Sequence, residues 1–174
     1  GWRVALMGRR EAPLHETAEG EDVLILPADV GDPAQVEAAF ARITQHWGRL
    51  DVLFNNAGTF TPPIPIEDLT LEAFRHEFSV DVDGVFLGCK HIIPKMQDHG
   101  GSVINMSSMC GVRAQGDLAA YNAAKAAVKA TELEKAKADA ANRVNELTAE
   151  LARLRDGSEL KEAIAKQKKA EADL

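Results

Sequence analysis

The segment Leu50-Asp51-Val52-Leu53-Phe54-Asn55-Asn56-Ala57-Gly58 places a short apolar run directly before two amides, a small residue and a glycine. The apolar run predicts a buried strand, and the small residues after it are typical of a loop whose backbone a flat ring can approach. Three similar runs predict further strands at residues 2–7, 23–26 and 102–106. Short runs of this kind are typical of strands in a parallel sheet.

Helical patterns separate these strands. Apolar residues recur at helical spacing between Asp32 and Trp47, with Asp32 as the expected N-cap and Pro33 in the first turn. A second, longer helix is predicted from Leu71 to Lys95. Because strands alternate with helices, the sequence predicts an α/β fold with a doubly wound parallel sheet covered by helices on both faces.

The composition changes near residue 131. The segment 131–174 is rich in Ala, Glu, Lys and Leu and contains neither a proline nor an aromatic residue. An apolar stripe of the coiled-coil kind runs through Val144, Leu147, Leu151 and Leu154. We therefore divide the chain into residues 1–130 and a helical hairpin or coiled-coil-like tail at 131–174. The stripe either mediates association or folds back over an uncovered face of the sheet.

The bulk properties exclude several classes of protein. The 174 residues carry a formal net charge of −7, which argues against a nucleic-acid partner. Cys89 and Cys110 have no metal-ligand spacing, so we expect no metal and two buried thiols in a reducing compartment. No apolar run is long enough to cross a membrane, and no signal-type segment opens the chain, so we expect a cytoplasmic protein.

Ser108, Tyr121 and Lys125 form the strongest chemical pattern. Tyr121 and Lys125 are four residues apart, so on a helix they lie on one face, a turn apart. A phenol is a poor acid or base at neutral pH, and a fixed positive charge beside it favours the phenolate. Ser108 follows a predicted strand, where its hydroxyl can hydrogen-bond a substrate oxygen.

Four segments, taken together, resemble the short-chain dehydrogenase/reductase family in order and approximate spacing. They are Ala28-Asp29-Val30, Asn55 to Gly58, Asn105 to Ser108, and Tyr121 to Lys125. The resemblance extends from Gly1 to about Lys129. It implies a partial Rossmann-like domain, a nicotinamide cofactor, a small alcohol or carbonyl substrate, and a possible homo-oligomer.

The resemblance also implies roles for single residues. Tyr121 resembles the general acid/base, Lys125 its electrostatic partner and a donor to the nicotinamide ribose, and Ser108 the group that orients the substrate oxygen. The implied cofactor-binding residues are Arg9, Arg10, Asp29, Val30, Asn55, Asn56, Ala57 and Gly58, together with Tyr121 and Lys125. An arginine after the family's second strand suits a 2′-phosphate, which favours NADP over NAD; a plain surface arginine pair is the alternative.

The sequence also departs from the family pattern. Asp81 occupies the fourth catalytic position, where the family usually has asparagine, and an ionised aspartate cannot donate a hydrogen bond. The family's first strand and its Gly-x-x-x-Gly-x-Gly pyrophosphate loop are not found in these residues, so neighbouring strands should have exposed edges and cofactor binding should be impaired. The substrate lid is likewise not recognisable. The alternative function is therefore an inactive fragment or chimera whose helical tail mediates association.

Overall fold

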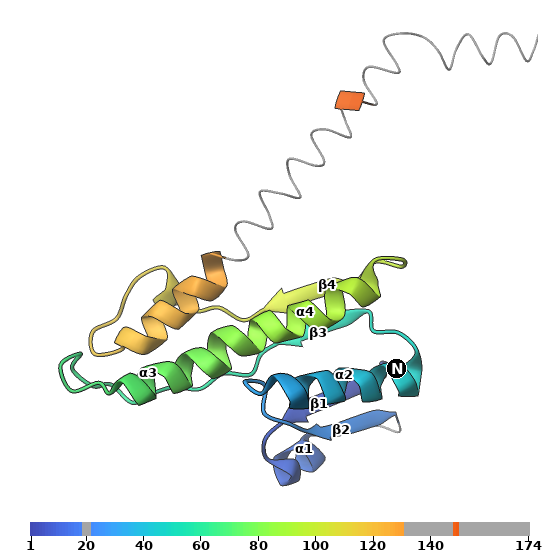
Figure 1. The fold of residues 1–174 in the computed structure, drawn as a ribbon, viewed down its shortest axis with the longest axis horizontal. Coiled ribbons are helices and arrows are strands. Elements are labelled where there is room, and N and C mark those ends of the chain that lie inside the picture. Colours follow the sequence, from blue (N-terminus) through green and yellow to red (C-terminus); the bar gives the residue numbers. More distant parts are fainter. Residues whose placement is uncertain (19–21, 131–147, 150–174) are drawn as a thin grey trace, which may run out of the picture. The chain divides into compact units, whose positions relative to one another are not determined.

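The computed structural model describes residues 1–18, 22–130 and 148–149. The chain divides into two units, Gly1–Thr131 and Glu132–Leu174, and the fold below is that of the first (Figure 1). The predicted helical tail and its apolar stripe lie outside the described residues, apart from two exposed helical positions at 148–149.

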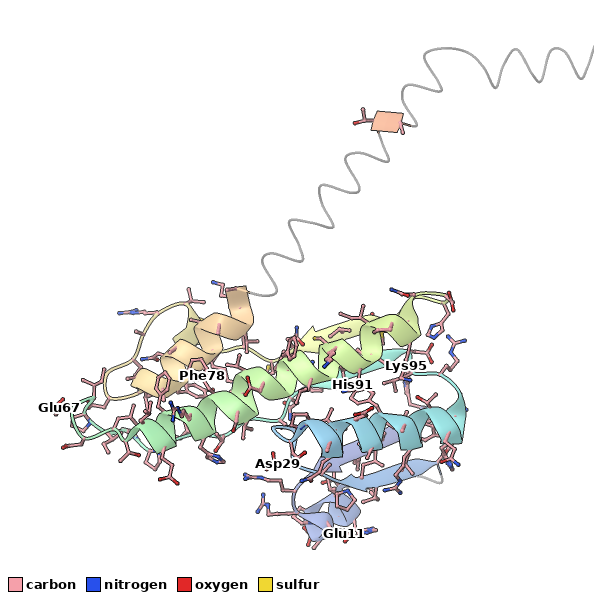
Figure 2. The ribbon with its side chains drawn as sticks, viewed as in Figure 1. Glu11, Asp29, Glu67, Phe78, His91 and Lys95 are labelled. Carbon is pink, nitrogen blue, oxygen red and sulfur yellow. The ribbon has the colours of Figure 1, made fainter. Side chains whose placement is uncertain are left out.

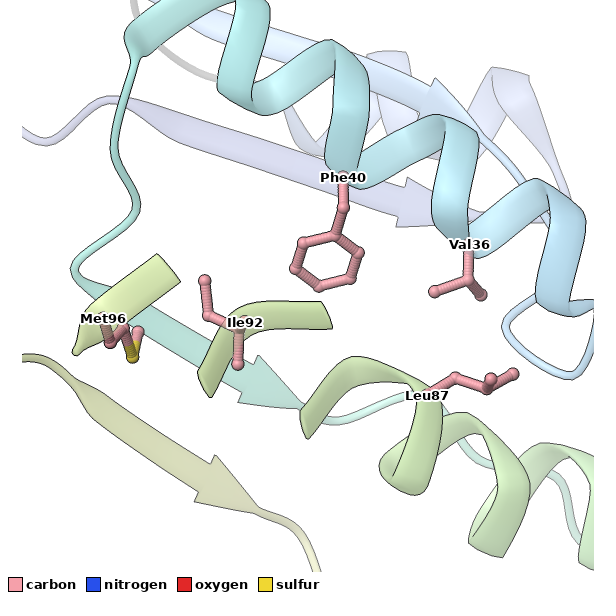
Figure 3. Close-up of a cluster of buried hydrophobic side chains, with 5 residues drawn as sticks. All are labelled: Val36, Phe40, Leu87, Ile92 and Met96. Carbon is pink, nitrogen blue, oxygen red and sulfur yellow. The ribbon is translucent and has the colours of Figure 1, made fainter. Parts of the chain in front are cut away.

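All four predicted strands are present, with ends shifted by one or two residues. They are β1 (Val4–Gly8), β2 (Val23–Pro27), β3 (Val52–Asn55) and β4 (Ser102–Asn105). β1 pairs in parallel with β2, and β3 pairs in parallel with β4. The arrows of β1, β3 and β4 point the same way in Figure 3, so the carboxyl ends of both strand pairs face the same side of this unit.

The helices differ from the predicted ones in two respects. The helix expected from 71 to 95 is a rod of three parts: α3 (Leu71–Phe78), a five-residue π-helix η1 (Ser79–Asp83) and α4 (Gly84–Met96). The short helix α1 (Glu11–Thr17) was not predicted, because it buries no residue and so has no apolar periodicity. A 3₁₀ turn, η2 (Met109–Gly111), precedes a helix whose described part covers residues 119–130.

Helix α2 (Pro33–Trp47) begins as the sequence predicts. The Asp32 carboxylate accepts hydrogen bonds from the backbone amides of Ala34 at 2.9 Å and Gln35 at 3.1 Å, so it caps the helix. Hydrogen bonds from the backbone and then the side chain of Gln35 hold the pKa of Asp32 below its ordinary value. The helix ends at Gly48, which adopts the left-handed conformation with φ of 75°.

Helix α2 holds the two strand pairs together through two apolar clusters. On one side Val36 and Phe40 pack against residues of α4 (Figure 3), and on the other Ala39 and Ile43 pack with Leu26 of β2. Met7 and Leu50 pack against both clusters, which are therefore neighbours. The first cluster consists of Val36, Phe40, Leu87, Ile92 and Met96.

The described strands form two separate two-stranded sheets rather than one continuous sheet. An apolar pocket of about 440 Å³ is lined by residues of β1, β3, α2 and α4. On β3 and β4 every second side chain faces away from α4, and Phe54 and Ile104 are each 50% exposed. Because β1 pairs only with β2 and β3 only with β4 among the described strands, the expected unpaired strand edges are present. The expectation that helices cover both faces is wrong for β3–β4 within the described residues, because helix α4 packs only on one side of β3.

Two smaller expectations concern cysteines and membranes. Cys89 and Cys110 are not joined in a disulfide, and each is half-buried rather than buried as predicted. Helices long and apolar enough to cross a membrane are not found in the part of the chain that the structure describes.

Candidate active site

The candidate site lies where β3 and β4 end. The loop after β3 contains Gly58 and Thr59, and the segment after β4 contains Met106 and Ser108. The π-helix η1 contributes Asp81, and the helix of residues 119–130 contributes Tyr121 and Lys125. Since the carboxyl ends of parallel strands are where α/β proteins bind their ligands, this position is suited to a binding site.

A buried ion pair lies at the centre of this region. Lys125 Nζ is 2.6 Å from Asp81 Oδ1, and the two side chains are 6% and 0% exposed. The contact is an ion pair between an ammonium and a carboxylate. Asp81 Oδ2 accepts a hydrogen bond from the Thr59 amide at 2.8 Å, and Lys125 Nζ donates to the Met106 carbonyl at 3.2 Å. The pair therefore joins four segments of the chain.

Tyr121 and Lys125 are neighbours, as their spacing predicts. Lys125 Nζ lies 5.6 Å from the centroid of the Tyr121 ring. Tyr121 is half-buried whereas Lys125 is buried, so Tyr121 is the more accessible of the two residues. A phenol that a ligand can reach is a group suited to proton exchange.

Ser108 lies in a segment that packs on the same helix. Its hydroxyl oxygen accepts a hydrogen bond from the Cys110 amide at 3.2 Å at the start of η2. The preceding Ser107 hydroxyl donates to the Lys125 carbonyl at 2.9 Å. Further along, the Asn122 side chain donates to the Gln115 carbonyl at 2.8 Å. The segment with Ser108 is thus fastened to the helix of Tyr121 and Lys125 at both ends.

Of the residues Asn55 to Gly58, the first makes structural contacts and the other three are exposed. The Asn55 side chain donates to Asn105 Oδ1 at 2.8 Å, and it lies so close to Gly88 that a Cβ there would overlap it. Asn55 therefore joins β3 to β4 and to α4. Asn56, Ala57 and Gly58 are exposed, and the backbone at Gly58 lies beside the ion pair, since a Cβ there would be 3.0 Å from Asp81 Oδ1.

The remaining predicted cofactor residues lie at the ends of β1 and β2. Asp29 is in the turn between β2 and α2 (Figure 2), and its carboxylate accepts a hydrogen bond from the Gly31 amide at 2.9 Å. Val30 packs against Gly84 of α4 and lines the apolar pocket. Arg9 and Arg10 follow β1 directly and are exposed. The structure thus places these four residues in a second group, at the carboxyl ends of the other strand pair.

Sequence reasoning missed two residues of the site. Glu77 is fully buried on α3, one helical turn before Asp81, and Phe60 packs against Tyr121. The spacing of Glu77 and Asp81 places them on one helix face and was the available signal. Nothing in the sequence pattern indicates that Phe60 contacts Tyr121, because the two residues are far apart in the chain.

Comparison with known proteins identifies the class. A family model described as enoyl-(acyl carrier protein) reductase matches residues 1–173. The chain belongs to the short-chain dehydrogenase/reductase family. Its curated relatives are named as dehydrogenases and reductases, so the chain has the lineage of an oxidoreductase.

Individual curated relatives match about two thirds of the chain. Levodione reductase of Leifsonia aquatica is 40% identical over 116 residues, which is 66% of this chain and 43% of that protein. Trans-4-hydroxycyclohexanecarboxylate dehydrogenase of Sinomonas cyclohexanicum is 42% identical over 63% of this chain and 42% of its own length. The chain therefore spans less than half the length of these relatives.

Solved structures confirm the fold. A 3-ketoacyl-(acyl-carrier-protein) reductase from Brucella melitensis, in complex with NADH, superimposes with a TM-score of 0.71 at 30% identity. The match covers 74% of this chain and 56% of that one. The described residues thus form part of a Rossmann-like α/β fold.

The contact between η2 and the Tyr121 helix gives a testable prediction. A Cβ on Gly111 would lie 2.5 Å from the Lys125 carbonyl oxygen, so Gly111→Ala should push the turn away and destabilise the protein by about 1–3 kcal/mol. Gly116→Ala is the matched control, because no atom lies within 4 Å of its Cβ. Urea unfolding followed by circular dichroism measures both. Equal stability of the two variants would contradict the packing described here.

Proposed function

We propose that this chain carries the acid/base half of a nicotinamide-dependent oxidoreductase that interconverts an alcohol and a carbonyl. The observation that carries the proposal is the half-buried Tyr121 side chain beside the buried ammonium of Lys125 at the carboxyl ends of β3 and β4. The named relatives support it, since two are dehydrogenases of hydroxycyclohexanecarboxylates and one of a hydroxysteroid.

The residues present fit the nicotinamide half of a cofactor. An ammonium group has three N–H donors, and the contacts of Lys125 with Asp81 and Met106 leave at least one for a ribose hydroxyl. The residues Asn56 to Gly58 are exposed beside them, and we propose that a flat ring approaches there. When bound, the nicotinamide supplies or accepts the hydride.

Proton transfer is the task of Tyr121. In carbonyl reduction its hydroxyl donates a proton to the substrate oxygen as that oxygen gains negative charge, and in alcohol oxidation the phenolate accepts the proton back. Lys125 is the proposed electrostatic partner of the phenol, and its charge is offset in part by the Asp81 carboxylate 2.6 Å away. Ser108 orients the substrate oxygen by a hydrogen bond. Asp81 balances the charge of Lys125 and fixes the Thr59 amide, so it positions the lysine rather than donating a proton.

The proposed cofactor is NADP rather than NAD. Arg9 and Arg10 are exposed directly after β1, where a guanidinium can form a bidentate contact with a 2′-phosphate. Asp29 and Val30, at the end of β2, are proposed to lie against the adenine.

The role of the phenol is tested by removing one hydroxyl. Tyr121→Phe should lower the rate of NADPH-dependent reduction of cyclohexanone at least about 100-fold, because the proton donor is lost while the ring contacts remain. Absorbance at 340 nm measures the rate, and circular dichroism checks that the fold is unchanged. Retention of the wild-type rate in a folded variant would exclude Tyr121 as the acid/base.

The cofactor preference is tested by calorimetric titration. NADPH should bind more tightly than NADH, and the double variant Arg9→Ser, Arg10→Ser should weaken NADPH binding about tenfold or more while NADH binding stays the same. Arg42→Ser, on an exposed position of α2, is the control. Equal affinity of the wild-type chain for both nucleotides would contradict the assignment of NADP.

A further inference from the structure

Two buried carboxylates hold the loop that follows β3. The Thr59 amide donates to Asp81 Oδ2 at 2.8 Å, and the Thr61 amide donates to Glu77 Oε2 at 3.3 Å. Both acids are 0% exposed, and they lie four residues apart on one rod of helix. We call this arrangement the carboxylate clamp. It fixes the backbone on both sides of Phe60.

The residue between the two fixed amides contacts the proposed acid/base. The ring centroid of Phe60 is 5.3 Å from that of Tyr121, and the planes meet at 83°. Such edge-to-face packing is a favourable geometry for two aromatic rings. Phe60 is nevertheless 53% exposed, so much of its apolar surface faces outward beside the Tyr121 ring.

The clamp is not explained by stability alone. Oε1 of Glu77 has no hydrogen-bond partner in the described part of the chain, and its other oxygen accepts only the 3.3 Å bond. Burying a carboxyl group with so few partners costs free energy, and an apolar side chain of similar size would avoid that cost. What Glu77 does provide is a fixed position for the loop that carries Phe60.

Further apolar residues are exposed in the segment that contains Ser108. Met109 and Val112, in and directly after the turn that begins at Ser108, are 75% and 61% exposed. Exposed apolar side chains therefore include Phe60, which contacts Tyr121, and two residues close to Ser108 in the sequence. A molecule whose oxygen meets the Tyr121 hydroxyl would have the exposed ring of Phe60 beside it.

We propose that Phe60 determines specificity, by forming an apolar wall that selects alcohols and ketones carried on an uncharged apolar body. Glu77 and Asp81 are positioning residues, which act by holding Phe60 against Tyr121. The proposal rests on the proposed function, because it takes Tyr121 as the residue that meets the substrate oxygen. Removal of the Phe60 ring should weaken binding of apolar alcohols and leave small polar ones unaffected.

The composition of the chain allows a direct readout that does not need turnover. Tyr121 is the only tyrosine in the sequence, so biosynthetic labelling with 3-fluorotyrosine gives a single ¹⁹F resonance from the site. Cyclohexanol is the apolar probe and glycerol the polar one. Cyclohexanol should shift the resonance with a saturable dependence on concentration, and glycerol should not.

Variants then test the wall. Phe60→Ala should move the resonance of the free protein and weaken cyclohexanol binding about tenfold, because contact with a large aromatic surface is lost. Phe60→Leu keeps an apolar wall and should weaken it less than about threefold. Ile66→Ala, an exposed apolar position in the same loop, is the matched control. Unchanged cyclohexanol affinity in Phe60→Ala, or no response to cyclohexanol in the wild-type chain, overturns the proposal.

A second set of variants tests the clamp. Glu77→Leu removes the acceptor for the Thr61 amide and should move the free resonance in the same direction as Phe60→Ala. Glu77→Gln keeps a carbonyl acceptor and should restore the wild-type position, while Glu72→Gln on the exposed side of α3 serves as the control. A wild-type resonance in folded Glu77→Leu overturns the positioning role of Glu77.

The two proposals fail in different ways. If cyclohexanol shifts the ¹⁹F resonance as expected but no hydride transfer is detected, the apolar wall of Phe60 stands and the oxidoreductase function is refuted. If the chain transfers hydride to cyclohexanone but its cyclohexanol affinity is unchanged in Phe60→Ala, the specificity role of Phe60 is refuted and the oxidoreductase function stands.

Discussion

The buried ion pair of Asp81 and Lys125 is the interaction on which the candidate site depends. It lies between the π-helix η1 and the helix of residues 119–130, and hydrogen bonds extend it to Thr59 after β3 and to Met106 after β4. Charges are tolerated in a protein interior only when they are paired. The ion pair and its two hydrogen bonds therefore hold the four segments together.

The fold explains why these segments meet. Parallel pairing of β3 with β4 brings their carboxyl ends together, and Asn55 and Asn105 close that edge with a hydrogen bond of 2.8 Å. Asp81 enters from a π-helix, a widened turn that often marks functional sites. Helix α2 packs on both strand pairs. It therefore links the strand pair that carries Asp29 and Val30 to the strand pair that carries the ion-pair site. The chemistry of the site thus follows from the topology.

The sequence predicts what depends on local pattern. The strands are predicted by their short apolar runs. Helix α2 is predicted because its apolar periodicity begins where Asp32 can cap a helix. The Tyr121–Lys125 neighbourhood follows from helical spacing alone, and it is observed. The π-helix could not be predicted from the sequence, because one widened turn hardly changes the apolar periodicity of a long helix. The gap between the two strand pairs, the buried Glu77 and the contact of Phe60 with Tyr121 depend on distant segments, which no local pattern encodes.

A double-mutant cycle tests the central claim most directly. Urea unfolding of Asp81→Leu, Lys125→Met and the double variant gives the coupling between the two side chains. If the ion pair is buried as described, each single variant should lose about 3–5 kcal/mol, since it leaves an unpaired charge inside the protein, and the double variant should lose far less than the sum. Losses that add to within about 0.5 kcal/mol would show that the two residues act independently and would contradict this account of the site.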